Sequence, residues 1–319
     1  MPSHVPVPDP DVVALMAERQ ARRPGSMRET GLDAVRAGLE ALPHPADLPK
    51  MADILDREIP CGHGMLPVRV YSPVAEAELP AIVYFHGGGM VMGTNHSFEP
   101  LARAIAAETG HRVIAVDYHL APEHPPPGQV EDAWEATEWV AAHAGELGVL
   151  PDRIAVLGDS AGGTLAALVA LRARERGGPR LYCQVLIYGG LDRDMATLSL
   201  LELPDGGIGL TRDDIFFLHH LARAGQPEPT GADEVPAYAA DLSGLPPAIV
   251  AVGELDPIRD WSERYAARLR EAGVQTTLTR YPGVGHGFVM QFAHLARGRQ
   301  ALAETAALLR AKAANPLPW

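Results

Sequence analysis

Cysteine is nearly absent from this chain, which has Cys61 and Cys183 in 319 residues. Two thiols make neither a disulfide framework nor a metal-binding pair, and both lie in or near apolar segments, so reduced structural thiols are expected. Lysine is as scarce, at Lys50 and Lys312, and no run of basic residues occurs. The formal net charge of -13 argues against nucleic acid or an anionic membrane as a partner, because phosphates attract clustered cations.

Long apolar runs are also missing. No stretch reaches the roughly 18 residues that are needed to span a bilayer, so no integral membrane association is expected. The N-terminal sequence MPSHVPVPDPDVV has no basic segment followed by an apolar stretch and a cleavage site. The expected location is therefore the cytoplasm. The 47% of hydrophobic residues is ample for a folded core, and the length favours one core with an insertion.

From residue 81 onward, short β-branched runs alternate with helical stretches. The expected strands are AIVYF (81–85), VIAVD (113–117), IAVLG (154–158), CQVLIY (183–188), AIVAV (248–252) and TTLTRY (276–281). The expected helices between and after them are 98–109, 130–143, 164–176, 261–272 and 293–314. This alternation predicts an α/β fold, with a mostly parallel central sheet and helices on both faces. An antiparallel strand pair is expected before it, over residues 54–71.

Two segments do not fit the alternation. The chain begins with two amphipathic helix-like stretches, 11–22 and 30–42, which precede the first strand signal. About sixty residues separate the strands 183–188 and 248–252, which is too long for a simple crossover, and they include a helix-like stretch, 211–222.

These observations predict a core and a two-part cap. The expected organisation is an N-terminal helical arm over residues 1–50 that is part of the cap, a catalytic core of 51–189 and 236–319, and an inserted cap segment over 190–235. Ligands are expected where the parallel strands end, at their carboxyl edge.

Ser160 lies at the centre of the sequence Gly158-Asp159-Ser160-Ala161-Gly162, between a short β-branched run and a longer run rich in alanine and leucine. The flanks predict a strand, a tight turn and a helix, which is the context of the G-x-S-x-G nucleophile elbow. The helix would direct backbone N–H groups and its positive end toward the serine. An ordinary strand-to-helix turn is the alternative interpretation.

A nucleophilic serine needs a histidine base. Among 13 histidines, His286 is favoured because it lies in the glycine-rich loop GVGHGF just past the last expected strand. The glycines allow the backbone a sharp path, so that the ring can reach over the sheet edge. A solvent-facing loop histidine is the alternative. His86 is interpreted as a structural anchor of its own loop.

The acid that orients the base is expected between the serine and the histidine in the chain order of α/β-hydrolases. Asp256 is the favoured residue because it lies in the loop after the strand 248–252. Glu254 is the first alternative, and Asp192 and Asp194 follow the preceding strand, where some hydrolases carry the acid. Asp260 is better placed to open the next helix.

Attack on an ester creates an oxyanion that needs N–H donors. The strand 81–85 leads into His86-Gly87-Gly88-Gly89, where consecutive glycines leave backbone N–H groups open to a ligand. The other donor is expected from the residue after the nucleophile, Ala161. A flexible glycine turn without function is the alternative.

Five motifs together resemble the hormone-sensitive lipase family of α/β-hydrolase esterases: His86-Gly87-Gly88-Gly89, Asp117-Tyr118-His119-Leu120-Ala121-Pro122-Glu123-His124-Pro125, Gly158-Asp159-Ser160-Ala161-Gly162-Gly163, Asp256-Pro257 and Gly285-His286-Gly287-Phe288. The resemblance covers about residues 50–315. It implies an α/β-hydrolase fold with a helical cap built from the arm and the insertion, and a homodimer as a family-level expectation. It also implies the nucleophile Ser160, the acid Asp256, the base His286 and backbone oxyanion donors at Gly88, Gly89 and Ala161.

The chain departs from this family's pattern at three positions. The family usually has arginine where this chain has His119, asparagine where it has Thr164 and proline where it has Gly189. None of these is a triad residue, so the departures concern the packing of the 117–128 loop and the floor of the pocket.

The function expected from these residues is that of a serine carboxylesterase acting on small-molecule esters with short- to medium-chain acyl groups. No cofactor and no metal are expected, because the triad needs none and no ligand cluster is evident from spacing. Candidate acyl-pocket residues are Met90, Met92, Ile215, Phe216, Phe217 and Leu218. Amidase, lactonase, deacetylase or acyltransferase activity would use the same triad. A non-catalytic ligand-binding homologue would be expected to lack the base, and an interfacial lipase to have a broad apolar lid.

Overall fold

One eight-stranded sheet forms the centre of the computed structural model, which describes residues 6–22, 25–75, 77–203 and 208–317. Its order is β1-β2-β4-β3-β5-β6-β7-β8. The strands are β1 (Asp53–Cys61), β2 (Gly64–Ser72), β3 (Leu79–Phe85), β4 (Arg112–Val116), β5 (Val149–Asp159), β6 (Leu181–Ile187), β7 (Ala248–Gly253) and β8 (Thr276–Tyr281). The β1–β2 and β2–β4 pairs are antiparallel and the other pairs are parallel, so the expected α/β class and mostly parallel sheet are confirmed.

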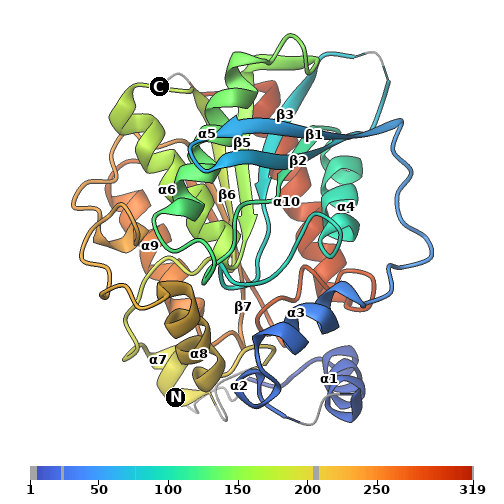
Figure 1. Cartoon of the computed structure of the whole chain (residues 1–319), viewed down its shortest axis with the longest axis vertical. Coiled ribbons are helices and arrows are strands. Elements are labelled where there is room, and N and C mark those ends of the chain that lie inside the picture. Colours follow the sequence, from blue (N-terminus) through green and yellow to red (C-terminus); the bar gives the residue numbers. More distant parts are fainter. Residues whose placement is uncertain (1–5, 23–24, 76, 204–207, 318–319) are drawn as a thin grey trace.

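Helices cover both faces of the sheet (Figure 1). One face packs against α5 (Gly128–Ala142), α6 (Ala161–Arg176) and α9 (Arg259–Glu271). The other packs against α4 (Glu99–Thr109) and α10 (Ala296–Ala314). The strands between these layers are apolar on both faces, as expected for a buried parallel sheet. Among the helices that the structure describes, none has the length and apolar character needed to cross a membrane.

The register of the parallel strands determines where the site can form. Phe85 at the end of β3 pairs with Gly158, and Asp159 at the end of β5 pairs with Ile187 of β6. Because parallel strands end at the same edge, the loops that follow β3, β5, β7 and β8 all leave the sheet there. Chemistry-bearing residues that are far apart in the sequence thereby become neighbours.

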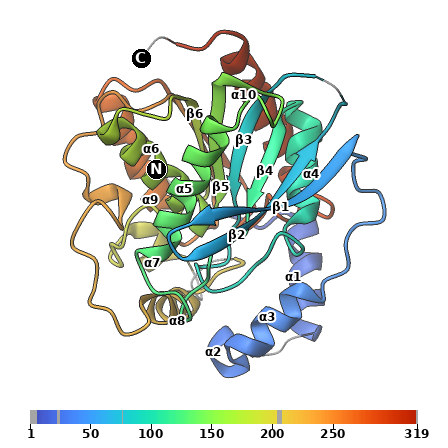
Figure 2. The ribbon, with the colours of Figure 1, turned by 45° about the horizontal axis from the view of Figure 1, so that its top comes forward.

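Two helical segments gather at this end of the molecule. They are the N-terminal helices α1 (Pro10–Arg22), α2 (Met27–Thr30) and α3 (Leu32–Glu40), and the inserted helices α7 (Leu198–Glu202) and α8 (Arg212–Arg223). In Figures 1 and 2, α2 and α8 lie side by side. Arg28 pairs with Asp213 at 3.2 Å, and the Met27 amide donates to Asp214 Oδ1 at 3.3 Å. A short 3-10 helix (Pro236–Tyr238) follows the insertion.

The arm differs from its expected helices in one respect. The helix expected over 30–42 is α3, which lies two residues inside that range at each end, and the short α2 before Gly31, whose φ is +82°, was not expected. A capping box between Ser26 and Glu29 begins α2. The five-residue α7 was not expected, since it is too short for a periodic signal. Residues 1–5 and 23–24 of the expected arm and 204–207 of the expected insertion lie outside the described residues.

Candidate active site

Ser160 occupies the sharp turn between β5 and α6. Its backbone has φ of +53° and ψ of -119°, a region that non-glycine residues rarely adopt and that strained functional sites use. The flanking glycines are required for close packing: a Cβ on Gly162 would lie 1.9 Å from the Phe85 carbonyl oxygen, and one on Gly158 would lie 2.0 Å from the Gly162 oxygen. The glycine at each flank therefore lets the strand and helix approach, and the turn exposes the serine.

His286 reaches Ser160 from the loop after β8. Its Nε2 lies 2.8 Å from Ser160 Oγ, and its side chain is 9% exposed. The backbone amide of His286 donates to the Ile208 carbonyl at 2.7 Å. The imidazole is thus brought to the serine hydroxyl by its loop, and the inserted segment fixes that loop from outside the sheet.

Asp256 holds the opposite side of the imidazole. Its Oδ2 lies 2.8 Å from His286 Nδ1, and the carboxylate is fully buried. The other oxygen, Oδ1, accepts from the Ile258 amide at 2.9 Å. Because Nδ1 faces a carboxylate, it carries the ring proton, and Nε2 is left as the acceptor for the serine hydroxyl.

The other candidate acids are engaged elsewhere. Glu254 accepts from a backbone amide of the loop that precedes the histidine, at 3.1 Å. Asp192 accepts from the amide of the residue after it at 2.7 Å, and Asp194 pairs with an arginine of α9 at 2.6 Å. Asp260 accepts from a backbone amide at 2.9 Å at the start of α7. Of these carboxylates, the structure brings Asp256 to the imidazole.

The glycine loop after β3 lies beside the elbow. Gly88 and Gly89 have φ of +106° and +64°, and no hydrogen bond within the described ranges uses their amides. The Gly88 carbonyl accepts from the amides of Val91 and Met92, at 3.1 Å each. Ala161 is the first residue of α6, so its amide has no acceptor within the helix.

Asp159 supports this loop. Its Oδ1 accepts from the Tyr84 hydroxyl at 2.7 Å and from the Gly87 amide at 3.1 Å. Burial raises the pKa of this carboxyl to about 6. Sequence reasoning gave Asp159 no role, and its position next to the nucleophile was the one available signal. The contacts make it a positioning group for the loop that carries Gly88.

His86 is packed as the anchor that the sequence suggested. Its ring stacks between Phe98 and Tyr118, with centroid distances of 5.0 and 4.4 Å. Its Nδ1 donates to the Gly87 carbonyl at 2.7 Å. Burial lowers the pKa of His86 to about 4, so the ring is neutral at pH 7. The imidazole that contacts the serine hydroxyl is that of His286.

Apolar side chains from the arm, the glycine loop, the insertion, the loop after β4 and the start of α9 form one cluster. Its buried members are Val35, Val91, Met92, Ala121, Leu200, Leu210, Ile215, Leu218, Ala222, Ile258 and Trp261. A Cβ on Gly89 would lie 3.1 Å from Leu218, so α8 covers the glycine loop. Phe216, which was a candidate acyl-pocket residue, is instead 46% exposed.

Two of the departures from the family pattern lie beneath the elbow. The Thr164 hydroxyl donates to the Gly190 carbonyl at 2.8 Å, and the Gly189 carbonyl accepts from Ser262 at 2.9 Å. A Cβ on Gly163 would lie 2.9 Å from the Gly189 Cα. Both departures therefore contribute to the packing of the pocket floor.

Comparison with known proteins adds an independent observation. The profile of the alpha/beta hydrolase fold family matches residues 82–290. Carboxylesterase NlhH of Mycobacterium tuberculosis is 42% identical over 264 residues, which cover 81% of this chain and 82% of that protein. The arylesterase of Saccharolobus solfataricus is 37% identical over 236 residues, which cover 70% of this chain and 73% of that protein.

A solved structure agrees over nearly the whole chain. The hyperthermophilic esterase from the archaeon Pyrobaculum calidifontis has a TM-score of 0.87 and 35% identity, covering 97% of this chain and 99% of that chain. With these similarities and its motifs, the chain belongs to the hormone-sensitive lipase family of α/β-hydrolase carboxylesterases and lipases.

Proposed function

We propose that this chain is a serine carboxylesterase in which Ser160 is the nucleophile, His286 the base and Asp256 the residue that orients the base. The observation that carries the proposal is the continuous pair of 2.8 Å contacts from the serine hydroxyl through the imidazole to a buried carboxylate. This arrangement meets the geometric requirement for an activated serine.

The reaction has two halves. Ser160 Oγ attacks the ester carbonyl carbon as its proton passes to His286 Nε2, and the imidazolium then gives that proton to the leaving alcohol. The acyl group is now bonded to Ser160. A water molecule, deprotonated by the same nitrogen, attacks the acyl carbon, and the serine leaves with the proton. Asp256 stabilises the imidazolium in both halves and stays ionised.

The carbonyl oxygen becomes an anion in each tetrahedral intermediate. The amides of Gly88, Gly89 and Ala161 are the proposed donors. Within the described residues no hydrogen bond uses the amides of Gly88 and Gly89, whose loop lies beside the elbow, and Ala161 directly follows the serine. Removing one such donor typically costs 100- to 1000-fold, roughly, in turnover. Asp159 holds the glycine loop through the Gly87 amide.

The arm and the insertion are proposed as the cap over this site. Their contacts with one another, and the position of Leu218 beside Gly89, support a cap that closes the acyl side with apolar side chains. Such a lining favours short- to medium-chain acyl groups. The proposed bounds are 1–50 and 190–235, around a core of 51–189 and 236–319. The homodimer and the cytoplasmic location stay predictions, and gel filtration with light scattering tests the former.

A chain-length series of p-nitrophenyl esters tests the activity. We expect wild type to hydrolyse esters and Ser160→Ala to lose about a millionfold in turnover. Ser243→Ala is the matched control, since this exposed serine contacts Asp241, and it should keep full activity. Retained activity in Ser160→Ala would overturn the assignment. Activity confined to lactones or amides would keep the triad and change the substrate class.

The acid is tested separately. Asp256→Asn should reduce turnover about 10 000-fold without unfolding, because the amide imposes the wrong imidazole tautomer. Glu254→Gln should have little effect, since Glu254 contacts a backbone amide and not the ring. The reverse result would move the acid to Glu254.

A further inference from the structure

A group of metal-ligating side chains lies away from the active site, where three elements meet. Cys61 ends β1, His119 lies in the loop after β4, and Asp132 is on α5. One ligand atom of each residue lies within 4.8 Å of those of the other two. Asp132 is fully buried, whereas Cys61 and His119 are partly exposed, so the group is at the surface with a closed inner side.

The Asp132 carboxylate is only half satisfied. Its Oδ2 accepts from the His119 amide at 2.9 Å and faces His119 Nδ1 at 2.8 Å. Its Oδ1 is buried and has no hydrogen-bond partner in the part of the chain that the structure describes. A buried carboxylate oxygen without a partner is costly. A bound cation would satisfy it.

Further imidazoles and carboxylates surround the group. The His124 ring lies 4.4 Å from that of His119, and the His63 ring lies 6.2 and 6.3 Å from His119 and His124. Glu131 lies 3.2 Å from His63 Nε2, and Glu135 accepts from the backbone amide next to Cys61 at 2.7 Å. The surroundings are anionic and offer a fourth nitrogen ligand at close range.

Zn²⁺ binds cysteine as the thiolate. Binding at Cys61 would therefore release the thiol proton to solvent and form the sulfur–metal bond, as coordinating thiols do.

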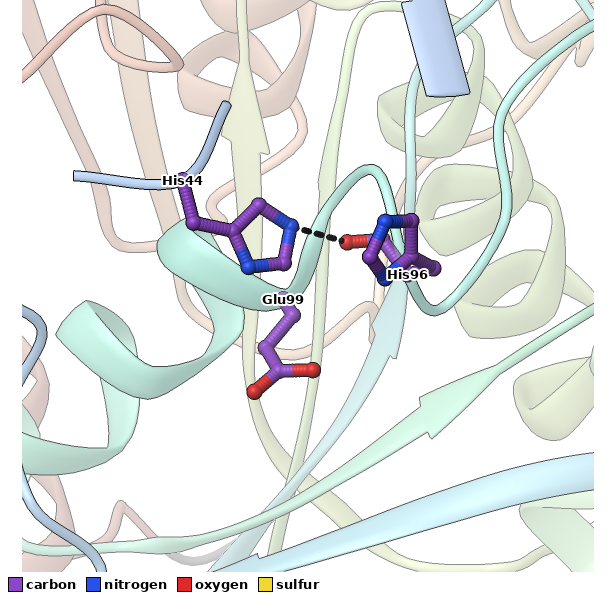
Figure 3. Close-up of side chains that lie close together, drawn as sticks. All are labelled: His44, His96 and Glu99. Carbon is purple, nitrogen blue, oxygen red and sulfur yellow. Dashed lines mark hydrogen bonds between the residues drawn. The ribbon is translucent and has the colours of Figure 1, made fainter. Parts of the chain in front are cut away.

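A second group of metal-ligating residue types is less suited to bind a cation. His44, His96 and Glu99 also lie within 4.8 Å of one another, and Figure 3 shows the His44 Nε2 bonded to the His96 carbonyl at 3.0 Å. The Glu99 carboxylate is already paired with Arg69 at 3.1 Å and Arg103 at 2.5 Å. Two arginines neutralise the one anionic ligand, so this group serves as a control.

We infer that Cys61, His119 and Asp132 form a zinc site, with His124 or His63 completing the shell. Zn²⁺ takes thiolate, imidazole and carboxylate ligands together in a tetrahedral arrangement. The spacing in the sequence did not predict this site, because its ligands come from a hairpin, a loop and a helix that are distant along the chain.

The site would clamp the β1–β2 hairpin to the loop that supports the active site. In that loop the Tyr118 hydroxyl donates to the His86 carbonyl at 2.8 Å, and the Ala121 amide donates to the Met90 carbonyl at 2.9 Å. Binding should therefore stabilise the fold, whereas the triad itself requires no metal.

Cobalt substitution tests the ligand set on the whole chain. Protein stripped with chelator and titrated with Co²⁺ should bind one equivalent and develop the near-ultraviolet charge-transfer band of a cobalt–thiolate bond. Zn²⁺ should displace the Co²⁺ and abolish the band. Cys61→Ser should lack the band, Asp132→Asn should bind at least tenfold more weakly, and His96→Gln should behave as wild type. A missing band in wild type, or an unchanged band in Cys61→Ser, would overturn the inference.

Thiol labelling gives a readout on wild type alone, so the result does not depend on how the variants fold. Cys183 is fully buried, which leaves Cys61 as the accessible thiol of the two. Zn²⁺ at stoichiometric concentration should slow iodoacetamide labelling of Cys61 at least tenfold and raise the melting temperature. Mg²⁺ should do neither, because it prefers oxygen ligands. Equal labelling rates with and without Zn²⁺ would contradict the site.

Discussion

The Ile208 carbonyl accepts a hydrogen bond of 2.7 Å from the backbone amide of His286. Ile208 belongs to the inserted segment and His286 to the loop after the last strand, so the insertion fixes the backbone of the proposed base. The inserted segment and the loop of His286 are in close contact at this point, since a Cβ on Gly209 would lie 2.3 Å from the His286 carbonyl oxygen. The insertion therefore positions the backbone that carries the imidazole.

Gly285→Ala tests this contact. The added Cβ would lie 2.2 Å from the Ile208 carbonyl oxygen, so the two segments must separate and the imidazole must move. We expect kcat for a p-nitrophenyl ester to fall about 100-fold, the cost of a displacement of about 1 Å at a catalytic group. Gly38→Ala is the control, since no atom lies within 4 Å of its new Cβ, and it should keep kcat. Unchanged kcat in Gly285→Ala would show that the contact does not position the base.

Gly162→Ala tests the packing of the elbow. Its Cβ would lie 1.9 Å from the Phe85 carbonyl oxygen, and both atoms belong to rigid elements. We expect the free energy of unfolding, measured in urea, to fall by about 3 kcal/mol, as for overpacked sites. Gly145→Ala has open space around its Cβ and should change this value little. Equal stability of the two variants would contradict the close approach of helix and strand.

The local part of this architecture could be predicted from the sequence. The strands and the turns after them are contiguous patterns, so the sequence alone predicts that the loops bearing Gly88, Ser160, Asp256 and His286 lie at one sheet edge. The register of parallel strands then brings them together. The short α2 before Gly31 could not be predicted, because its four residues are too few for a periodic signal.

Contacts between distant segments could not be predicted in this way. The pairing of Ile208 with His286, the support of the glycine loop by Asp159, and the meeting of Cys61 with Asp132 each join elements whose relative position follows from tertiary packing. Neither the hydrophobic periodicity nor the spacing of residues along the chain predicts such contacts. They are also the contacts that orient the proposed catalytic groups or create the inferred zinc site.

Arg36→Ala tests how the arm affects catalysis. Its guanidinium donates to the carbonyls of Val91 and Ala121 at 2.7 and 2.9 Å and pairs with Glu123 at 2.7 Å, so α3 holds the end of the glycine loop. We expect a loss of about 2 kcal/mol in unfolding free energy, typical of charged hydrogen bonds, and a kcat that falls while KM changes less.

Arg28→Ala is the matched control for that experiment. Arg28 pairs with Asp213 at 3.2 Å, but both side chains are about half exposed, at 49% and 55%. An exposed pair contributes about 0–1 kcal/mol, so this variant should keep its stability and kcat. If both variants behaved alike, the arm would act as a whole and not through Arg36.

Asp159→Asn tests the buried carboxyl beside the nucleophile. Burial raises the pKa of Asp159 to about 6, above its value in the unfolded chain. Between about pH 4 and pH 6 the folded protein therefore binds more protons than the unfolded chain, and stability falls as pH rises through this window. A shift of this size corresponds to about 3 kcal/mol. Asparagine has no such titration.

The measurement is the unfolding free energy of wild type and Asp159→Asn across that window. Asp117, whose pKa burial also raises to about 6, titrates in both proteins and cancels in the difference. Asparagine can still accept from Tyr84 and the Gly87 amide, so the fold should be retained. We expect wild type to lose stability relative to the variant as pH rises from about 4 to about 7. A difference that stays constant with pH would mean that Asp159 ionises in the folded protein as easily as in the unfolded chain.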